Sequence, residues 1–382
     1  MGYQLTEDQT LIRNMVREFA ENEVKPIAAE IDKNHRFPTE TVKRMAELGL
    51  FGLSTPEALG GGGDSAEDVL SYILAVEELS RVCATHGVIL SAHVSLGMYP
   101  ILKYGSDAIK EKYIPDLAAG KKLAAFCLTE AGAGTDAASQ QTVAEKKGDK
   151  YVVNGAKVFI TNGAVADNFI IFAMTDKSKG LKGITAFTVE KSFPGFQVGQ
   201  VEDKMGICAS STTEIIFKDM EVPADHMLGK EGEGFKIAMQ TLDGGRVGIG
   251  AQALGIAQGA LEAAISYAKE RKQFGKPISA NQGIQWMLAE MATKIEAARL
   301  LVYQAANMKG AGVRFSKEAA MAKLFAAETA MDVTTKSVQI HGGIGYTRSY
   351  PVERMMRDAK ITEIYEGTSE VQKMVIAGNI LA

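Results

Sequence analysis

Within residues 360–370, a carboxylate, Glu366, lies between the bulky Tyr365 and the bare Gly367. Glycine lets a backbone or a ligand approach closely and permits a positive φ angle. The apolar Ile364 and the ring of Tyr365 would exclude water from the carboxylate and raise its pKa, as a general base requires. This stretch could therefore abstract a proton from a bound substrate.

The same stretch also permits a purely structural interpretation. A helix could end at Gly367, and Thr368 or Ser369 could cap the next helix, which would leave Glu366 in solvent. The stretch alone leaves both interpretations open, so the choice depends on the rest of the chain.

A second candidate is the loop at residues 129–136, which follows a predicted strand. Its small residues could direct backbone N–H groups toward phosphate oxygens, and the alternative is a plain surface loop. The loop lacks a GxGxxG pattern, which disfavours a Rossmann nicotinamide site. No Lys-Ser/Thr pair follows the glycine run at residues 60–63, which disfavours a P-loop.

Two charged motifs lie next to glycines. Asp243 and Arg246 precede a glycine-rich helical segment that another group must approach closely, and the alternative is a surface ion pair of little energy. Residues 270–275 have the composition of a charged helix end, where cations favour the dipole. His341 has no Asp or Ser around it in a triad pattern, which disfavours a catalytic histidine.

The composition excludes several classes of protein. The 382 residues are 46% hydrophobic and 23% charged, and a formal net charge of -4 argues against nucleic acid or an anionic membrane as the main partner. No apolar run is long enough to span a bilayer and no signal-peptide pattern is present, so a cytoplasmic location is predicted. Cys83, Cys127 and Cys208 lack metal-ligand spacing, so no metal is expected.

Helical signals dominate the chain up to about Gly120. Residues 6–9 form a capping box ahead of apolar residues at helical spacing. Pro26 interrupts this helix, Pro38 starts another, and residues 65–68 are expected to cap the next. An N-terminal helical domain is therefore predicted for residues 1–120.

Short apolar runs separated by turn residues follow. They predict strands at residues 123–128, 151–153, 156–161, 169–174, 184–189 and 214–217. Asn154-Gly155 is the strongest hairpin signal, because both residues suit the positive φ angles of a type I′ turn. A compact β domain is predicted for residues 121–230.

Helical periodicity returns after Gly234 and continues to the end of the chain. Two stripes at core spacing are Ile284, Leu288, Met291, Ile295 and Ala298, and Ala319, Lys323, Ala326 and Ala330. The pattern is broken only at residues 310–312 and 341–345. A helical bundle is predicted for residues 231–382.

Six blocks in this order resemble the motifs of the acyl-CoA dehydrogenases. They are residues 122–136, 158–163, 243–246, 271–275, 339–345 and 360–378. The resemblance implies a mostly helical α+β fold, with an N-terminal helical domain, a middle β-barrel domain and a C-terminal four-helix bundle.

The resemblance also implies the reaction. It implies FAD-dependent α,β-dehydrogenation of an acyl-CoA thioester to the trans-2-enoyl-CoA, with Glu366 as the base and an electron-transferring flavoprotein as the acceptor. Some branches of the family carry this glutamate at the position of Gly245, so Gly245 with Glu366 indicates the straight, short-chain branch, similar to butyryl-CoA dehydrogenase. The alternatives are an enoyl-CoA reductase or oxidase with the same site, and a non-catalytic acyl-CoA-binding scaffold.

Finally, the resemblance assigns site residues and a homotetramer, a dimer of dimers, in which one subunit reaches the cofactor of its neighbour. The FAD residues would be Phe126, Leu128, Thr129, Gly134, Thr135, Phe159, Thr161, Arg271, Phe274, Gln282, Gln339, Gly342, Gly343, Thr368 and Glu370. The substrate residues would be Thr135, Asp243, Arg246, Tyr365 and Gly367. Ala131, Thr135 and Phe159 depart from the usual Pro, Ser and Trp.

Overall fold

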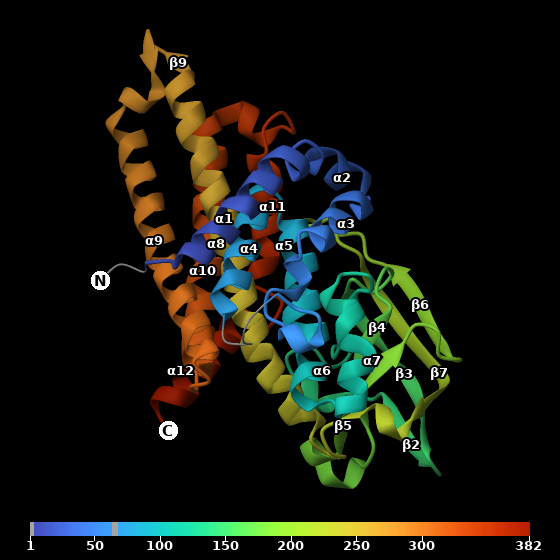
Figure 1. Ribbon diagram of the computed structural model, residues 1–382. Helices are drawn as coiled ribbons and strands as arrows, with labels where there is room; N and C mark the ends of the chain where they lie inside the picture. The colour runs from blue at the N-terminus through green and yellow to red at the C-terminus, as the bar shows by residue number, and fades with distance from the viewer. Residues whose placement is uncertain (1–3, 63–67) are drawn as a thin grey trace.

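The computed structural model describes residues 4–62 and 68–382. Figure 1 shows three regions: long C-terminal helices on the left, a twisted sheet at the lower right, and the N-terminal helices between them. The predicted succession of helical, sheet and helical regions is confirmed. The domain boundaries predicted at residues 120 and 230 stay predictions.

The N-terminal region is built from helices, as predicted. The α-helices are α1 (Glu7–Phe19), α2 (Ala28–Asn34), α3 (Thr39–Glu47), α4 (Val69–Val82), α5 (Ala84–Ser91), α6 (Tyr99–Tyr104) and α7 (Asp107–Ala118). The capping box at Thr6 is confirmed, because its hydroxyl accepts from the Gln9 N–H and the Gln9 side chain accepts from the Thr6 N–H. Asp68 caps α4 at Ser71, whereas residues 65–67 of the predicted cap lie outside the described residues.

The strands form one eight-stranded sheet in the order β6-β7-β3-β2-β4-β5-β8, with β1 parallel to β4. Their bounds are β1 (Ala124–Cys127), β2 (Val143–Lys147), β3 (Lys150–Thr161), β4 (Asn168–Met174), β5 (Ile184–Glu190), β6 (Phe196–Val201), β7 (Thr212–Pro223) and β8 (Met227–Leu228). The rings of Phe169 in β4 and Phe196 in β6 lie 4.5 Å apart, although several strands separate them in the sheet. The sheet therefore curls over a core of its own.

The predicted hairpin at Asn154-Gly155 is wrong. These residues lie inside the continuous strand β3, at a bulge where the register against β7 shifts. The Asn154 side chain donates to Asp219 and accepts from the Asp219 N–H, so the side chain stabilises the bulge instead of a turn. The hairpin from β2 to β3 turns at Gly148, which has a φ of 66°.

Three long helices dominate the C-terminal region: α8 (Gly234–Glu270), α9 (Gln282–Gly310) and α10 (Ser316–His341). Two shorter helices, α11 (Val352–Thr362) and α12 (Ser369–Ile380), pack against α10. The strands β9 (Lys272–Gln273) and β10 (Lys276–Pro277) form a small hairpin between α8 and α9. None of the helices in the described residues is long and apolar enough to cross a membrane.

Helix α8 is the central element, because it contacts both α10 and the N-terminal helix α4. A Cβ atom at Gly255 or Gly259 would lie 2.2 Å from the Glu77 carbonyl oxygen or 2.0 Å from that of Arg81. Only glycine permits this backbone approach. The close packing of α4 on α8 fixes the position of the residues that follow from Asp243 onward.

Candidate active site

Glu366 lies in the short loop between α11 and α12, and its backbone is strained. Glu366 has a φ of 56° and Gly367 a φ of 90°. For a residue with a Cβ atom this conformation costs about 1 to 3 kcal/mol and persists only where the surroundings hold it. Thr368 caps α12 by accepting from the Val371 N–H, so the predicted cap is confirmed.

The carboxylate of Glu366 is shielded from solvent. Its Oε2 atom is buried and has no hydrogen-bond partner among the described residues. Burial raises the pKa of Glu366 to about 7, against the opposing charges of Arg246 and Lys323. The interpretation of Glu366 as a solvated residue at a helix end is therefore wrong, and a dry carboxylate with a raised pKa is what proton abstraction near neutral pH requires.

Helix α8 presents a bare backbone to this carboxylate. A Cβ atom at Gly245 would lie 2.9 Å from Glu366 Oε2 and 2.8 Å from Leu96 Cδ2. Something must shift if a side chain is placed there. The glycine-rich segment after Asp243 therefore includes the place where the Glu366 carboxylate approaches α8, in keeping with the close approach that its sequence indicated.

Arg246 is within electrostatic reach of Glu366 and is held by an ion pair. Its guanidinium donates to Asp243 at 2.6 Å, and Arg246 is only 5% exposed. Asp243 also accepts a hydrogen bond from Ser316 of α10. The alternative of a surface pair worth little energy is therefore wrong. Tyr365, next to the base, donates to Gln252 of α8.

A buried ion pair joins the two sheet segments that were predicted to contact the flavin. Lys157 is fully buried, and its ammonium donates to Glu130 at 2.8 Å, to Gln140 at 2.9 Å and to the Leu128 carbonyl at 3.2 Å. Glu130 also accepts from two backbone N–H groups, those of residues 141 and 142. The sequence analysis missed this pair, which fixes the 129–136 loop against β3.

Phe159 is the most unusual residue of the sheet. It has a φ of 60°, sits at a register shift between Lys157 and Ile160, and leaves 62% of its surface exposed. Phe159 is therefore not part of the core of the sheet region, although an aromatic residue in a strand could also have been one. A strained backbone that displays an aromatic ring on the surface provides a platform on which a planar ligand can stack.

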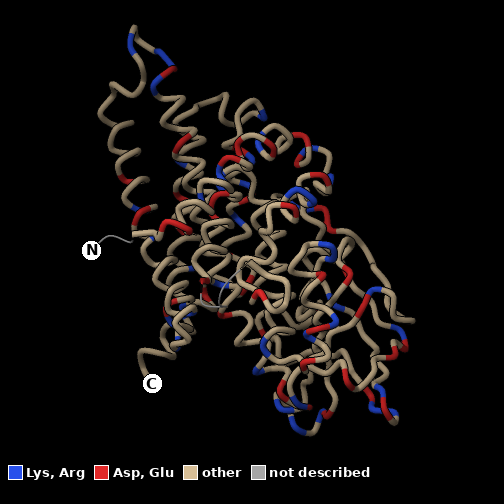
Figure 2. The backbone as a smooth tube through the Cα atoms, viewed as in Figure 1, with Lys and Arg blue, Asp and Glu red and all other residues tan. Residues whose placement is uncertain are grey.

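The remaining predicted cofactor residues lie elsewhere. Arg271, Gly342 and Gly343 line one cavity of about 750 Å³, beside the hairpin of β9 and β10. Phe274 in this hairpin is fully exposed at a φ of 51°. Figures 1 and 2 place the hairpin, with its cluster of Lys and Arg, at the tip of the helical bundle, far from the sheet. A single chain therefore does not bring Arg271 and Phe159 together.

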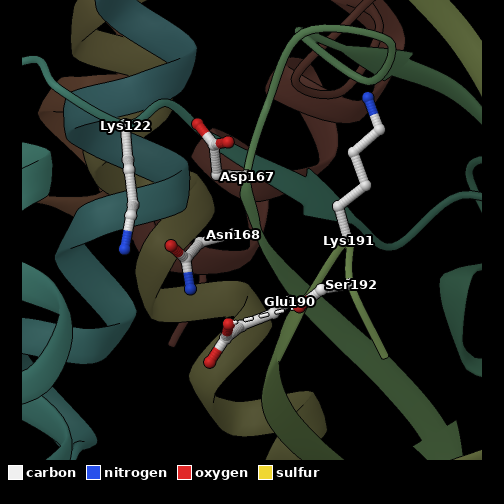
Figure 3. Close-up of a pocket in the computed structure, with 6 residues that line it drawn as sticks. All are labelled: Lys122, Asp167, Asn168, Glu190, Lys191 and Ser192. Carbon is white, nitrogen blue, oxygen red and sulfur yellow. Dashed lines mark hydrogen bonds between the residues drawn. The ribbon is translucent and has the colours of Figure 1, made fainter. Parts of the chain in front are cut away.

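Most of the other predicted cofactor residues are distributed over strands and helices of the sheet region and the bundle. Phe126 lies in β1, Thr161 ends β3, Gln282 begins α9, Gln339 lies in the last turn of α10, and Glu370 lies in the first turn of α12. A further cavity of about 330 Å³ in the sheet region contains no predicted site residue (Figure 3). Its Lys191 points away from the centre and donates to the Ala164 carbonyl.

Comparison with known proteins identifies the class to which this fold and this site belong. The chain matches the acyl-CoA dehydrogenase N-terminal domain over residues 6–121, the middle domain over 125–220 and the C-terminal domain over 232–381. The chain therefore belongs to the acyl-CoA dehydrogenase family.

Individual relatives narrow the comparison. A short-chain specific acyl-CoA dehydrogenase of Clostridium acetobutylicum is 62% identical over 380 residues, covering 100% of both chains. The structure of butyryl-CoA dehydrogenase from Megasphaera elsdenii is 53% identical with a TM-score of 0.98, again over 100% of both chains. A chain from structural work on the electron transferring flavoprotein of Acidaminococcus fermentans is 56% identical, with a TM-score of 0.98 and 100% coverage of both chains.

Proposed function

We propose that this chain is an FAD-dependent enzyme that oxidises a short-chain acyl-CoA to the trans-2-enoyl-CoA. The observation that carries the proposal is the shielded carboxylate of Glu366, whose Oε2 has no hydrogen-bond partner among the described residues and faces the bare backbone of Gly245. A carboxylate in water is too weak a base for a thioester α-proton. A dry site with preorganised donors overcomes this difficulty.

In the proposed reaction, Glu366 takes the α-proton of the thioester. Its own backbone N–H, as the family resemblance implies, donates to the thioester carbonyl and stabilises the negative charge that develops there. Bound FAD supplies the acceptor for the hydride that leaves the β-carbon. Arg246, held by Asp243, and the packed ring of Tyr365 keep the carboxylate in position.

The residues of the chain fit FAD in two regions. On the sheet, Phe159 offers an exposed ring, and the 129–136 loop offers backbone N–H groups beside it, with open space around Gly132 and Gly134. At the base of the hairpin, the exposed Arg271 and the bare backbones of Gly342 and Gly343 line a cavity. A cation with open N–H groups suits a pyrophosphate.

These two regions of one chain are far apart, so we propose that two subunits complete each FAD site in a dimer of dimers. Arg271→Ala would remove a charge-assisted hydrogen bond worth about 1.5 to 3 kcal/mol. FAD affinity should fall by about 10- to 100-fold, measured by flavin fluorescence and by the FAD retained after dialysis. Lys276→Ala, which removes a cation from the same hairpin, is the control. Full FAD retention by Arg271→Ala would contradict the shared site.

For the substrate, we propose a preference for straight chains near butyryl-CoA. The pairing of Gly245 with Glu366 and the similarity to short-chain enzymes support it. The test is anaerobic bleaching of the flavin by a series of acyl-CoA chain lengths, with kcat/KM expected to be highest for butyryl-CoA. A maximum at octanoyl-CoA or longer, or with isovaleryl-CoA, would reject this preference.

We propose an electron-transferring flavoprotein as the electron acceptor and the cytoplasm as the location. The similarity to a chain from the Acidaminococcus fermentans work supports the acceptor. Mixing the substrate-reduced enzyme with a purified flavoprotein of this kind should restore the oxidised flavin spectrum. Rapid reoxidation by air alone would instead favour an oxidase.

A further inference from the structure

Lys323 is a buried cation in the N-terminal third of α10. It is 0% exposed and belongs to the stripe that also contains Ala319, Ala326 and Ala330. Its ammonium donates to the Gly367 carbonyl oxygen at 2.8 Å and forms no ion pair among the described residues. Burying a lysine with so little compensation is costly, so its position next to the proposed base calls for a physical explanation.

A second buried donor reaches the same loop. Gln372 of α12 is 0% exposed, and its Nε2 donates to the Gly367 carbonyl at 2.8 Å and to the Glu366 carbonyl at 3.2 Å. Lys323 and Gln372 thus hold the carbonyls of the two residues whose φ angles are positive. These contacts provide the surroundings that a strained turn requires.

The charges around Glu366 also single out Lys323. The cations that act on Glu366 are Arg246 from α8 and Lys323 from α10. Arg246 is already paired with Asp243 at 2.6 Å, whereas no carboxylate in residues 4–62 and 68–382 forms an ion pair with Lys323. Its charge is therefore available to Glu366.

Other titratable groups face the same region. Glu363 and Glu370 act on Lys323 from the ends of α11 and α12, and the hydroxyls of Tyr72 and Tyr365 are within electrostatic reach of Glu366. Burial raises the pKa of both tyrosines, so they remain neutral near neutral pH. Removing the charge of Lys323 therefore changes the electrostatic potential at Glu366 without breaking any ion pair among the described residues, whereas removing Arg246 would break its pair with Asp243.

We propose that Lys323 is a positioning residue for the proton-abstracting carboxylate: its ammonium fixes the Gly367 carbonyl, and its positive charge keeps Glu366 ionised in the dry pocket. This inference rests on the proposed role of Glu366 as the base. It adds to that role a cation from α10, a helix that carries none of the predicted substrate residues.

The test compares Lys323→Met with the wild type. Removing a nearby opposite charge should raise the pKa of Glu366 by about one unit or more. The acidic limb of the pH profile for anaerobic flavin reduction by butyryl-CoA should move up by the same amount. Because burial lowers the pKa of Lys323 to about 8, its charge is lost above that pH, and there the electrostatic difference between the two proteins should disappear.

A second measurement needs no substrate. The carboxylic-acid C=O band of Glu366, assigned by its loss in Glu366→Gln, can be followed with pH in infrared difference spectra. Its midpoint should rise in Lys323→Met and stay unchanged in Lys336→Met, which removes an equal charge from the same helix at surface ion pairs. FAD content should be equal in all of these proteins.

An unchanged midpoint and an unchanged acidic limb in folded, FAD-loaded Lys323→Met would overturn the inference. If Lys323→Met does not fold, Lys323→Gln, which keeps a donor for Gly367 and removes the charge, should show the same upward shift, and no shift would again overturn it. A wild type that butyryl-CoA does not reduce would refute the proposed function, while the infrared titration would still report on Lys323 and Glu366.

Discussion

Glu366→Gln is expected to slow anaerobic flavin reduction by butyryl-CoA by at least about 10²- to 10⁴-fold, the usual contribution of a general base. The amide keeps the shape of the side chain and cannot accept the α-proton as a carboxylate does. The carboxylate Oε2 has no hydrogen-bond partner among the described residues, so the change breaks no protein contact at that atom. Stopped-flow reduction of the purified variant and the wild type gives the comparison.

Two controls separate lost chemistry from lost structure. FAD content and binding of butyryl-CoA should remain close to the wild type, because the proposed contacts of both ligands lie on other groups. Glu328→Gln is a matched surface control, since Glu328 of α10 forms only an exposed ion pair with Lys373, and it should leave the reduction rate unchanged. Near-wild-type reduction in Glu366→Gln would reject Glu366 as the base.

Moving the carboxylate to α8 is expected to restore part of the rate. A Cβ at Gly245 would lie 2.9 Å from the present Glu366 Oε2, so a glutamate at 245 occupies the space that Glu366→Gly vacates. Glycine at 366 also relieves the strain of a φ of 56°. Two effects limit the recovered rate: the carboxylate at 245 is oriented less well toward the α-proton, and its Cβ lies 2.8 Å from Leu96. Stopped-flow reduction of Glu366→Gly alone and of the double variant measures it.

The second large effect concerns the ion pair inside the sheet region. Lys157→Met is expected to lower the free energy of unfolding by about 3 to 5 kcal/mol, because it leaves Glu130 buried without its cation. Lys157 is 0% exposed and bridges three acceptors. Denaturation followed by circular dichroism, at fixed protein concentration and FAD load, measures the loss.

The surface pair of Lys150 with Glu221 is the matched control for this experiment. It joins the neighbouring strands β3 and β7 at 2.6 Å, but both side chains are exposed, so Lys150→Met should cost only about 0 to 1 kcal/mol. Adding Glu130→Gln to Lys157→Met should recover part of the loss, because the uncompensated charge is gone. An equal decrease in the free energy of unfolding for Lys150→Met and Lys157→Met would show that burial of the Lys157–Glu130 pair does not increase its effect on stability.

Local chemistry predicted much of this molecule. The capping box at Thr6, the buried stripe of α10 and the succession of regions depend on neighbouring residues, and all are confirmed. The prediction of a turn at Asn154-Gly155 was wrong because a tertiary contact overrides the turn preference of this dipeptide. Asp219 of the neighbouring strand β7 accepts a hydrogen bond from the Asn154 side-chain amide and donates its backbone N–H to the Asn154 side-chain oxygen.

For the candidate site too, the features set by neighbouring residues were predicted and those set by tertiary packing were missed. The tyrosine and glycine beside Glu366 correctly indicated a dry carboxylate, and the glycine-rich start of α8 correctly indicated a close approach. Lys323 and Gln372 were missed because their role arises from packing between α10, α12 and the Glu366 loop. A signal was present, since Lys323 is a charged residue within a stripe of alanines that the helical period places in the core.

With Glu366 as the proposed base, its close approach to Gly245 also constrains how the position of the base can change in evolution. A lineage that acquired a glutamate at 245 first would force it against Glu366, and one that lost Glu366 first would lose the proposed base. Each single step is expected to lower activity although the pair of steps keeps a carboxylate in the site, which is a case of strong epistasis between neighbouring sites. Descendants of this chain are therefore expected to inherit the position of their base unless both residues change together, and that position is a durable marker of ancestry within the family.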